Sequence, residues 1–316
     1  FLNQLSEKTK KEYPTCRTWQ KAFDQLTPYI SKGTHLVVFD EFPWMASERK
    51  ELVAILKFYW DRKWKNNSHF KLILCGSVAN FMIKHLIHSE SLHNRKTLEL
   101  KINPLSPLEA QLFFRKKRST FEICKFLMTF GGIPKYLEQI NPNLSFYQNI
   151  EKLCFSRHGF FVNEYESIFK EQFKVIKKYE PIIESLTTGP KTKTELEVHT
   201  HSSSGGGFNA TLDQLERAGF IVKVPSLDLE KQSHKSRTIR YKLWDEWIRF
   251  YFTYIRDNLH TIYNQDEGVL PHQIEKSLPS YFGIAFESLC MKNILTICKK
   301  MGISSQSIIK FGSYFK

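Results

Sequence analysis

The sequence predicts an α/β protein: a partial parallel sheet, a helical region, a small module of helices and strands, and the start of a further α/β domain. Three observations predict this organisation. Two short apolar runs, within 35–45 and 71–77, flank an amphipathic stretch, which is a β–α–β pattern. From 107 to 179 the apolar residues recur with helical spacing. From 179 to 247, short helical segments precede two alternating strands.

The first apolar run ends in two adjacent carboxylates. Residues 36–39 are continuously apolar, as in a strand buried on both faces of a parallel sheet, and Asp40 and Glu41 follow. Ligands of open α/β sheets bind at this carboxyl edge. In a Walker B strand the aspartate holds Mg²⁺, and the next glutamate orients or deprotonates the attacking water. An ordinary strand that ends in two solvated acids has the same pattern, so both interpretations stay open.

The second apolar run ends in a hydroxyl and favours the first interpretation. Residues 71–77 read Lys-Leu-Ile-Leu-Cys-Gly-Ser, and residues 49–65 between the runs have apolar side chains at helical spacing. A right-handed crossover would therefore bring the two strands side by side. In P-loop ATPases a polar residue after this strand senses the γ-phosphate, and Ser77 or Asn80 would fill that role.

Local signals predict several element boundaries. Thr15 or Thr18 is expected to cap a helix that ends at Ile30. Residues 97–102 alternate as a strand does, and residues 80–88 resemble a short helix. The stretch 131–134, Gly-Gly-Ile-Pro, predicts that one helix ends and another begins.

Residues 179–247 are typical of a winged helix, with helices at 180–188, 192–199 and 208–218 and strands at 221–224 and 238–243. The third helix would enter a DNA groove and the basic wing would hold phosphates. Winged helices also bind proteins, and the acidic Asp213 and Glu216 make the third helix electrostatically mixed. The candidate DNA-binding residues are Gln214, Arg217, Lys231, Lys235 and Arg237.

The last part of the chain contains an aromatic helix and a single candidate acid. Residues 244–259 interleave aromatic side chains with Arg249 and Arg256, which predicts either base stacking or a buried linker helix. The buried linker is the favoured interpretation. A further helix within 273–301 contains Phe286 and Glu287.

The composition favours a polyanionic partner. The formal net charge is +14 and the isoelectric point is about 9.4, so DNA is an expected partner; lysine-rich usage from an AT-rich genome is the alternative. The six cysteines form no C-x-x-C pair and are expected to be reduced, as in a cytoplasmic protein. No apolar run approaches the length of a membrane span, so no membrane partner is expected.

These segments, taken in order, resemble the archaeal-type ATPase family of the AAA+ P-loop class. Its members carry an ATPase domain, a winged helix and a carboxyl-terminal restriction-endonuclease-like domain. The matching segments are 38–42, 74–77, 91–95, 104–107, 131–137, 241–245 and 286–287.

The resemblance implies an enzyme that hydrolyses Mg²⁺–ATP and acts on nucleic acid. ATP turnover would move the winged helix. The resemblance is also compatible with a homo-oligomer. It implies four regions: a partial ATPase core at 1–106, a helical lid at 107–178, the winged helix at 179–247, and a linker helix with the start of a nuclease-like domain at 248–316. By resemblance, Asp40 binds Mg²⁺, Glu41 positions water, and Ser77 or Asn80 senses the γ-phosphate. Arg95 contacts the nucleotide of its own subunit or of a neighbouring subunit, and Lys135 of the lid is the sensor-2 cation, which reaches the phosphates. Glu287 is the first acid of a nuclease-like site. Arg95 and Lys135 also fit ordinary solvated side chains.

One departure from the family pattern concerns the phosphate-binding loop. A P-loop reads G-x-x-x-x-G-K-S/T, and these 316 residues contain no such segment; residues 31–34, Ser-Lys-Gly-Thr, have the letters in the wrong order. The sequence is therefore expected to be a fragment without the first strand, the P-loop and the following helix. The alternative is a degenerate relative, a non-catalytic winged-helix protein that binds DNA or protein.

Overall fold

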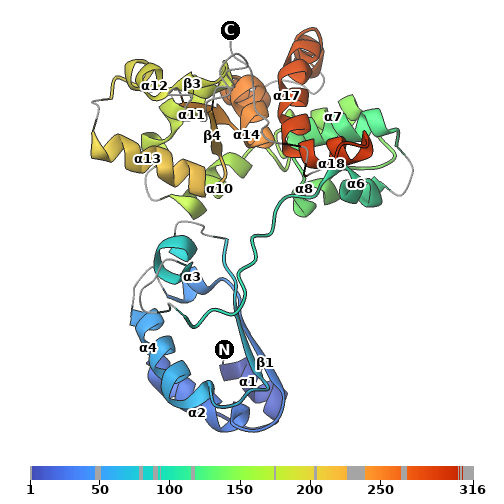
Figure 1. The fold of residues 1–316 in the computed structure, drawn as a ribbon. Helices are drawn as coiled ribbons and strands as arrows, with labels where there is room; N and C mark the ends of the chain where they lie inside the picture. Colours follow the sequence, from blue (N-terminus) through green and yellow to red (C-terminus); the bar gives the residue numbers. More distant parts are fainter. Residues whose placement is uncertain are drawn as a thin grey trace. The chain divides into compact units, whose positions relative to one another are not determined.

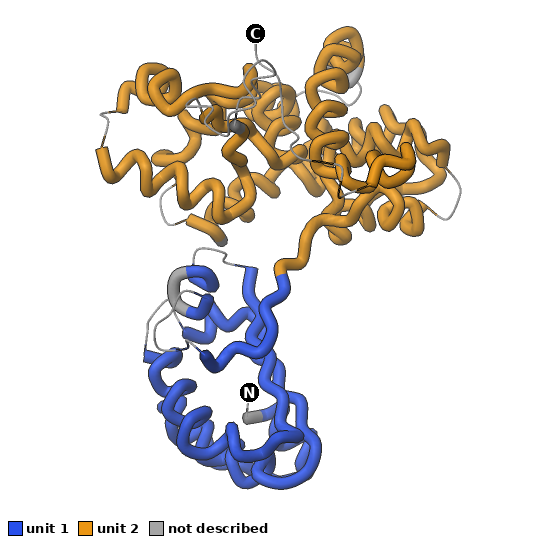
Figure 2. Tube along the Cα trace, in the orientation of Figure 1, with its two compact units in different colours: residues 1–100 blue, residues 101–316 orange. Residues whose placement is uncertain are grey.

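The computed structural model describes residues 2–308 except 47–50, 78–80, 88–91, 93, 115–117, 174–175, 203–204, 226–238, 265–268, 305 and 307. The chain folds into two compact units, residues 1–100 and 101–316, which Figure 2 distinguishes by colour. Each unit has its own apolar core.

Unit 1 is built on a pair of parallel strands, β1 (His35–Phe39) and β2 (Phe70–Leu74), in register from His35 opposite Phe70 to Phe39 opposite Leu74. The connection is α4 (Glu51–Tyr59), which continues into the π-helical turn η1 (Trp60–Trp64). This confirms the predicted β–α–β unit. Among the described residues of unit 1, the further helices are α1 (Leu2–Thr9), α2 (Trp19–Ile30), α3 (Phe42–Met45) and η2 (Met82–Ile87) (Figure 1).

One face of this sheet packs against α2 and the crossover helix. Thr18 caps α2, as predicted, by accepting a hydrogen bond from the Lys21 backbone amide. Phe23 of α2 stacks on Phe39 of β1 at a centroid distance of 5.7 Å and meets the edge of Trp64 at 5.2 Å. These large side chains are fully buried or nearly so, and they hold the sheet and helices together.

The opposite face of the sheet is exposed among the described residues. Leu36 and Val38 of β1 are 61% and 48% exposed, so the expectation of a strand buried on both faces is wrong here. The expected strand at 97–102 also does not form, although its alternate residues Leu98, Leu100 and Ile102 are exposed apolar side chains. An alternating segment becomes a strand only when a neighbouring strand accepts its hydrogen bonds, and within the described residues this segment has no such neighbour.

The first part of unit 2 is helical, as predicted. Gly131, with φ of +72°, ends α7, and Pro134 begins α8. Gly132 is required because a Cβ there would lie 2.1 Å from the Leu105 carbonyl oxygen. The elements are α6 (Pro107–Ala110), η4 (Gln111–Phe114), α7 (Thr120–Phe130), α8 (Pro134–Glu138), α9 (Phe146–Cys154), α10 (Glu164–Gln172) and η5 (Ile176–Lys178).

Three helices and a three-stranded antiparallel sheet follow. The capping box predicted at the start of α12 is present, with Thr192 and Glu195 each accepting a hydrogen bond from the other's backbone amide. The third helix begins at Gly206, two residues earlier than expected. In chain order the elements are α11 (Glu180–Thr187), β3 (Lys191–Thr192), α12 (Lys193–His199), α13 (Gly206–Arg217), β4 (Ile221–Pro225) and β5 (Ile239–Leu243), and β5 is the central strand.

The remaining helices complete the core of unit 2. Trp247, Phe250 and Tyr254 are buried, which confirms the buried linker and contradicts base stacking by these rings. Tyr281 donates a hydrogen bond to the Met128 carbonyl at 3.1 Å, so α17 is part of this core. The elements are α14 (Glu246–Phe250), η6 (Tyr251–Ile255), η7 (Arg256–Asn258), α15 (Leu259–Asn264), α16 (Val269–Glu275), α17 (Leu278–Lys292) and α18 (Ile294–Lys300).

Candidate functional site

The backbone after β1 turns sharply at the two carboxylates. Glu41 has φ of +47°, a left-handed conformation that costs a non-glycine residue about 1–2 kcal/mol. The Glu41 amide donates to Asp40 Oδ1 at 3.1 Å. The Phe42 amide then donates to the Cys75 carbonyl at 2.8 Å, which ties the turn to the end of β2. The strained residue is thus fixed by its neighbours, a feature common at functional sites.

The turn brings Glu41 and Ser77 together. Ser77 Oγ donates to Glu41 Oε2 at 3.1 Å, and the Ser77 amide lies 3.5 Å from the same oxygen. Gly76 permits this approach, because a Cβ there would lie 2.4 Å from Pro43 Cδ. Asp40 is exposed beside this contact. Asn80, the other candidate for the same role, lies outside the described residues.

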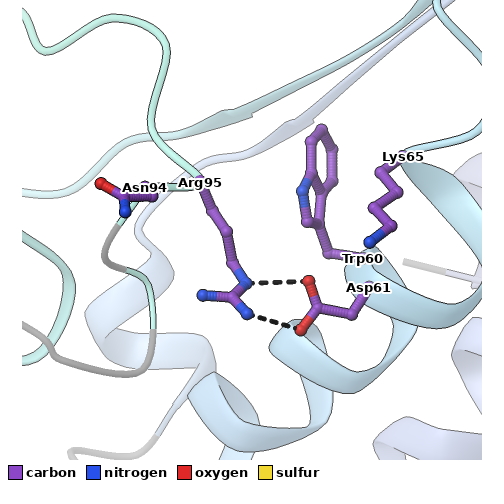
Figure 3. A pocket seen from close by; sticks show the side chains of 5 residues that line it. All are labelled: Trp60, Asp61, Lys65, Asn94 and Arg95. Atoms are coloured by element: carbon purple, nitrogen blue, oxygen red, sulfur yellow. Dashed lines mark hydrogen bonds and ion pairs between the residues drawn. The ribbon is translucent and has the colours of Figure 1, made fainter.

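Arg95 lies in a different part of unit 1, where it pairs with Asp61 of η1. Its Nε donates to Oδ1 and its Nη2 to Oδ2, both at 2.8 Å, and this bonding lowers the pKa of Asp61 from its ordinary value. Together with Trp60, Lys65 and Asn94, the pair lines a pocket of about 370 Å³ (Figure 3).

The pocket lies at the amino edge of the sheet. Trp60 contacts Phe70, the first residue of β2, at a centroid distance of 6.2 Å. Glu41 and Ser77, in contrast, follow the last residues of β1 and β2. The structure therefore does not bring Arg95 together with the carboxylates of its own sheet.

Lys135 belongs to unit 2 and is exposed on α8. Its ammonium lies 5.5 Å from the centroid of the Phe160 ring, a cation–π contact. This contact fits the ordinary exposed lysine that the sequence also allowed.

The candidate DNA-binding residues of α13 differ in their surroundings. Gln214, a candidate DNA contact, is half-buried, and its Oε1 accepts a 2.6 Å hydrogen bond from the Tyr179 hydroxyl. Arg217 is exposed. Lys223 pairs with both acidic residues of the helix, at 3.1 Å from Asp213 and 2.7 Å from Glu216. Lys231, Lys235 and Arg237 lie outside the described residues.

Glu287 of α17 has a lysine partner. Its carboxylate lies 2.9 Å from the ammonium of Lys242, which is buried on β5, whereas Glu287 itself is about half exposed. In the described parts of the chain, no group of three or more histidine, cysteine, aspartate or glutamate side chains could hold a metal ion. Sequence reasoning missed this pair because 45 residues separate its members.

The chain is similar to one known protein in sequence and to another in structure. No family model matches the chain. The uncharacterized protein MJECL04 of Methanocaldococcus jannaschii is 28% identical over 303 residues, which are 94% of this chain and 64% of that protein. The chain thus spans less than two thirds of the length of this relative.

The structure is similar to that of the Walker-type ATPase PABY2304 of Pyrococcus abyssi, with a TM-score of 0.52 and 17% identity over 79% of this chain and 75% of the other. The chain therefore shares the fold of a Walker-type ATPase. Among the described residues, no helix combines the length and apolar character that a membrane crossing needs.

Proposed function

We propose that this chain is part of an archaeal-type P-loop ATPase that hydrolyses Mg²⁺–ATP. The observation that carries the proposal is the hydrogen bond from Ser77 to Glu41 where two parallel strands end. Ligands of open α/β sheets bind at this edge. The fold shared with the Pyrococcus abyssi Walker-type ATPase supports the same function.

Three side chains have different roles in this proposal: those of Asp40, Glu41 and Ser77. The exposed Asp40 carboxylate suits Mg²⁺, which nucleotide sites hold through one or two carboxylates together with substrate phosphates. A larger cluster of acids is therefore not required. Glu41 positions the attacking water, and the Ser77 hydroxyl fixes the orientation of the Glu41 carboxylate. When bound, Mg²⁺ neutralises charge on the phosphates.

The exposed apolar surface of unit 1 supports a P-loop unit that completes the sheet. Leu36 and Val38 on β1 and Ile73 on β2 are exposed on one face. A parallel sheet normally has helices on both faces. A P-loop strand and its helix, which these 316 residues do not contain, would cover this face and give residues 97–102 a partner.

Unit 2 supplies the parts that would move. We propose that α6–α10 form the helical lid, with Lys135 as its candidate cation, and that α11–β5 form a winged helix. The order of three helices and three antiparallel strands supports the winged helix. Arg217 on α13 and the net charge of +14 support an action on nucleic acid.

Asp40 is tested by the Mg²⁺ dependence of ATP binding. The native protein is first characterised by its intact mass and amino-terminal sequence, and it should contain G-x-x-x-x-G-K-S/T. Asp40→Asn should then lose most of the Mg²⁺-dependent gain in ATP affinity, whereas Asp24→Asn, which removes an exposed acid paired with Lys63, should keep it. An unchanged Mg²⁺ dependence in Asp40→Asn would exclude Asp40 from the metal site.

A native protein without a P-loop would instead favour the second candidate, a non-catalytic winged-helix protein that binds DNA or protein. The pairing of Lys223 with Asp213 and Glu216 supports this candidate. The lysine neutralises part of the negative charge with which α13 would repel a polyanion. Salt-dependent DNA binding with no effect of ATP is its expected signature.

A further inference from the structure

The pocket at the amino edge of unit 1 belongs to neither the proposed ATPase site nor the winged helix. We propose that it binds a nucleotide unit, with the phosphate at Arg95 and Lys65 and the planar base on Trp60. The site lies wholly within unit 1, at the edge opposite Glu41, and does not depend on a P-loop.

The phosphate half of the site is indicated by the Asp61–Arg95 pair. A guanidinium binds carboxylate and phosphate in the same two-bonded geometry, and Asp61 already holds Arg95 in it through two contacts of 2.8 Å. An entering phosphate would therefore compete with Asp61 for Arg95. Lys57 and Lys65 also lower the pKa of Asp61 through their charge, so both ammonium groups act at this place. Arg95 and Lys65 line the pocket together with the single carboxylate of Asp61, so its lining carries an excess of one positive charge.

The base half of the site is indicated by Trp60. Figure 3 shows its indole between Arg95 and Lys65, beside the ion pair. The ring is half-buried and is held in place by its contact with Phe70. Aromatic rings of this kind bind nucleic acid bases by stacking, whichever base is present. An inorganic anion has no ring that could stack on the indole, so Trp60 would not contribute to its binding.

The size of the pocket fits one nucleotide unit. Its volume of about 370 Å³ lies at the lower end of the range for small-ligand sites. Duplex DNA does not fit, since its bases are stacked and paired inside the helix. A free mononucleotide and one residue of a single strand present the same phosphate and base, so the experiment must separate these two sources.

The test uses the 316-residue chain and two probes. A 5′-fluorescein-labelled oligothymidylate is titrated by fluorescence anisotropy, and AMP and inorganic phosphate are each titrated directly by calorimetry. Arg95→Gln should weaken binding of the ligand that the pocket takes, the oligonucleotide or AMP, by about tenfold, the loss expected for a charged hydrogen-bond donor. Arg62→Gln, which removes an exposed arginine of the same helical turn that does not line the pocket, should change binding less than about twofold.

Asp61→Asn separates a binding role from a folding role. The substitution removes the carboxylate that competes with phosphate for Arg95, so the nucleotide should bind about two- to fivefold more tightly. This factor corresponds to the free energy of a partly exposed charge interaction. Damage to the local fold would instead make Asp61→Asn and Arg95→Gln weaken binding together. Trp60→Leu should weaken AMP more than inorganic phosphate.

The outcomes show whether the pocket binds a nucleotide unit, and whether that unit is a free nucleotide or one residue of a single strand. Arg95-dependent binding of the oligonucleotide but not of AMP would assign a single strand, and the reverse would assign a free nucleotide; either result supports the proposal. Binding that is unchanged in Arg95→Gln would overturn it. So would binding of inorganic phosphate as tight as that of AMP in a protein that binds AMP, or a loss of affinity in Asp61→Asn. None of these results depends on ATP hydrolysis, so the ATPase proposal can fail while this site stands.

Discussion

The Ser77 hydroxyl donates a 3.1 Å hydrogen bond to Glu41, which joins the residues that follow two neighbouring parallel strands. The left-handed backbone of Glu41 and the contact of Gly76 with Pro43 hold this geometry in place. The contact links an acid able to position water with a hydroxyl able to orient that acid. It is the structural basis for proposing a catalytic centre at this edge.

Ser77→Ala should separate catalysis from stability. The hydrogen bond is exposed, so its loss should cost about 0.5 kcal/mol or less in the free energy of unfolding. In a native protein shown to contain the proposed P-loop, kcat for ATP hydrolysis should fall about tenfold or more because the Glu41 carboxylate is no longer oriented. Thermal unfolding and steady-state ATP hydrolysis measure the two effects, with Ser31→Ala as the control. An unchanged kcat would remove Ser77 from the site.

Asp245 should make the stability of unit 2 depend on pH. Burial raises its pKa from 3.8 to about 6, although part of its surface remains accessible. Between these values the folded chain retains a proton that the unfolded chain has released, so this stabilising contribution is present below pH 4 and is lost as the pH rises through about 6.

Asp245→Asn keeps an acceptor for the Ile248 amide but cannot titrate. Relative to this variant, the wild type should lose about 1–2 kcal/mol of unfolding free energy between pH 4 and pH 6.5, a value reduced for the accessible surface. Urea unfolding at a series of pH values measures the difference. Parallel stability curves for the two proteins would contradict the prediction.

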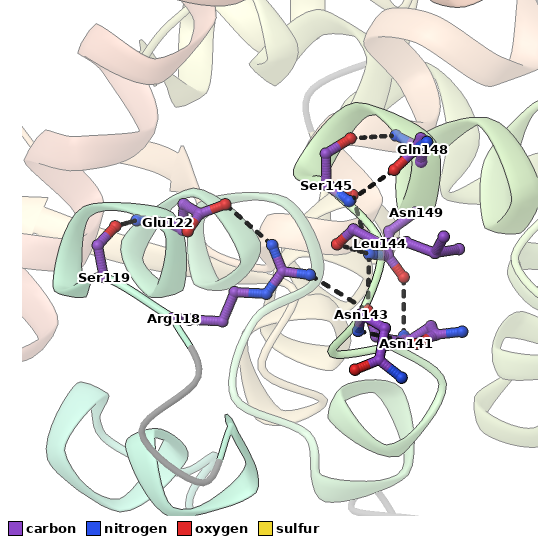
Figure 4. A network of polar contacts seen from close by, with 9 residues as sticks. All are labelled: Arg118, Ser119, Glu122, Asn141, Asn143, Leu144, Ser145, Gln148 and Asn149. Atoms are coloured by element: carbon purple, nitrogen blue, oxygen red, sulfur yellow. Dashed lines mark hydrogen bonds and ion pairs between the residues drawn. The ribbon is translucent and has the colours of Figure 1, made fainter.

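Asn149 fixes the segment before α9 (Figure 4). Its Nδ2 lies within hydrogen-bonding distance of the carbonyls of Asn141, Leu144 and Ser145, at 2.9–3.1 Å, and its Oδ1 accepts from the Asn141 amide at 2.8 Å. Because the side chain is only 1% exposed, Asn149→Ala should cost about 2–3 kcal/mol. The exposed Asn143→Ala should cost less than about 0.5 kcal/mol in the same urea titration. Equal losses would show that burial is not what makes Asn149 important.

Glu287 should act as the counter-ion of Lys242. Lys242 is 4% exposed, so Glu287→Gln leaves a buried ammonium less well compensated. The expected cost is about 1 kcal/mol, because the glutamate itself is half exposed and screened by solvent. Lys242→Met should cost less than this, since it removes the buried charge. If Glu287 instead served only as a metal ligand, chemical denaturation of Glu287→Gln would show no loss of stability.

Elements that depend on local signals could be predicted from the sequence. Thr18, Thr192 and Gly131 act within one helical turn of their own position, and all three behave as expected. The β–α–β unit followed from hydrophobic periodicity for the same reason. The proximity of Glu41 and Ser77 followed in turn, because the carboxyl ends of adjacent parallel strands share an edge.

Contacts between distant segments could not be predicted in this way. Arg95 and Asp61 are 34 residues apart, and Lys242 and Glu287 are 45 apart, so no periodic pattern links the members of either pair. Gln214 lies on a helix face that periodicity marks as outward, but Tyr179 from an earlier segment covers it. Residues 97–102 have the strand pattern without a strand beside them among the described residues.

The Glu41→Gln variant shows whether the Glu41 carboxylate takes part in ATP hydrolysis. Single-turnover ATP hydrolysis and equilibrium ATP binding are measured in the native protein, after its amino-terminal sequence has been shown to contain the proposed P-loop, and in the variant. Removing the base should slow hydrolysis by about a hundredfold or more and leave the Kd for ATP within about twofold. Hydrolysis at the wild-type rate in Glu41→Gln would mean that the turn after β1 is not the catalytic centre.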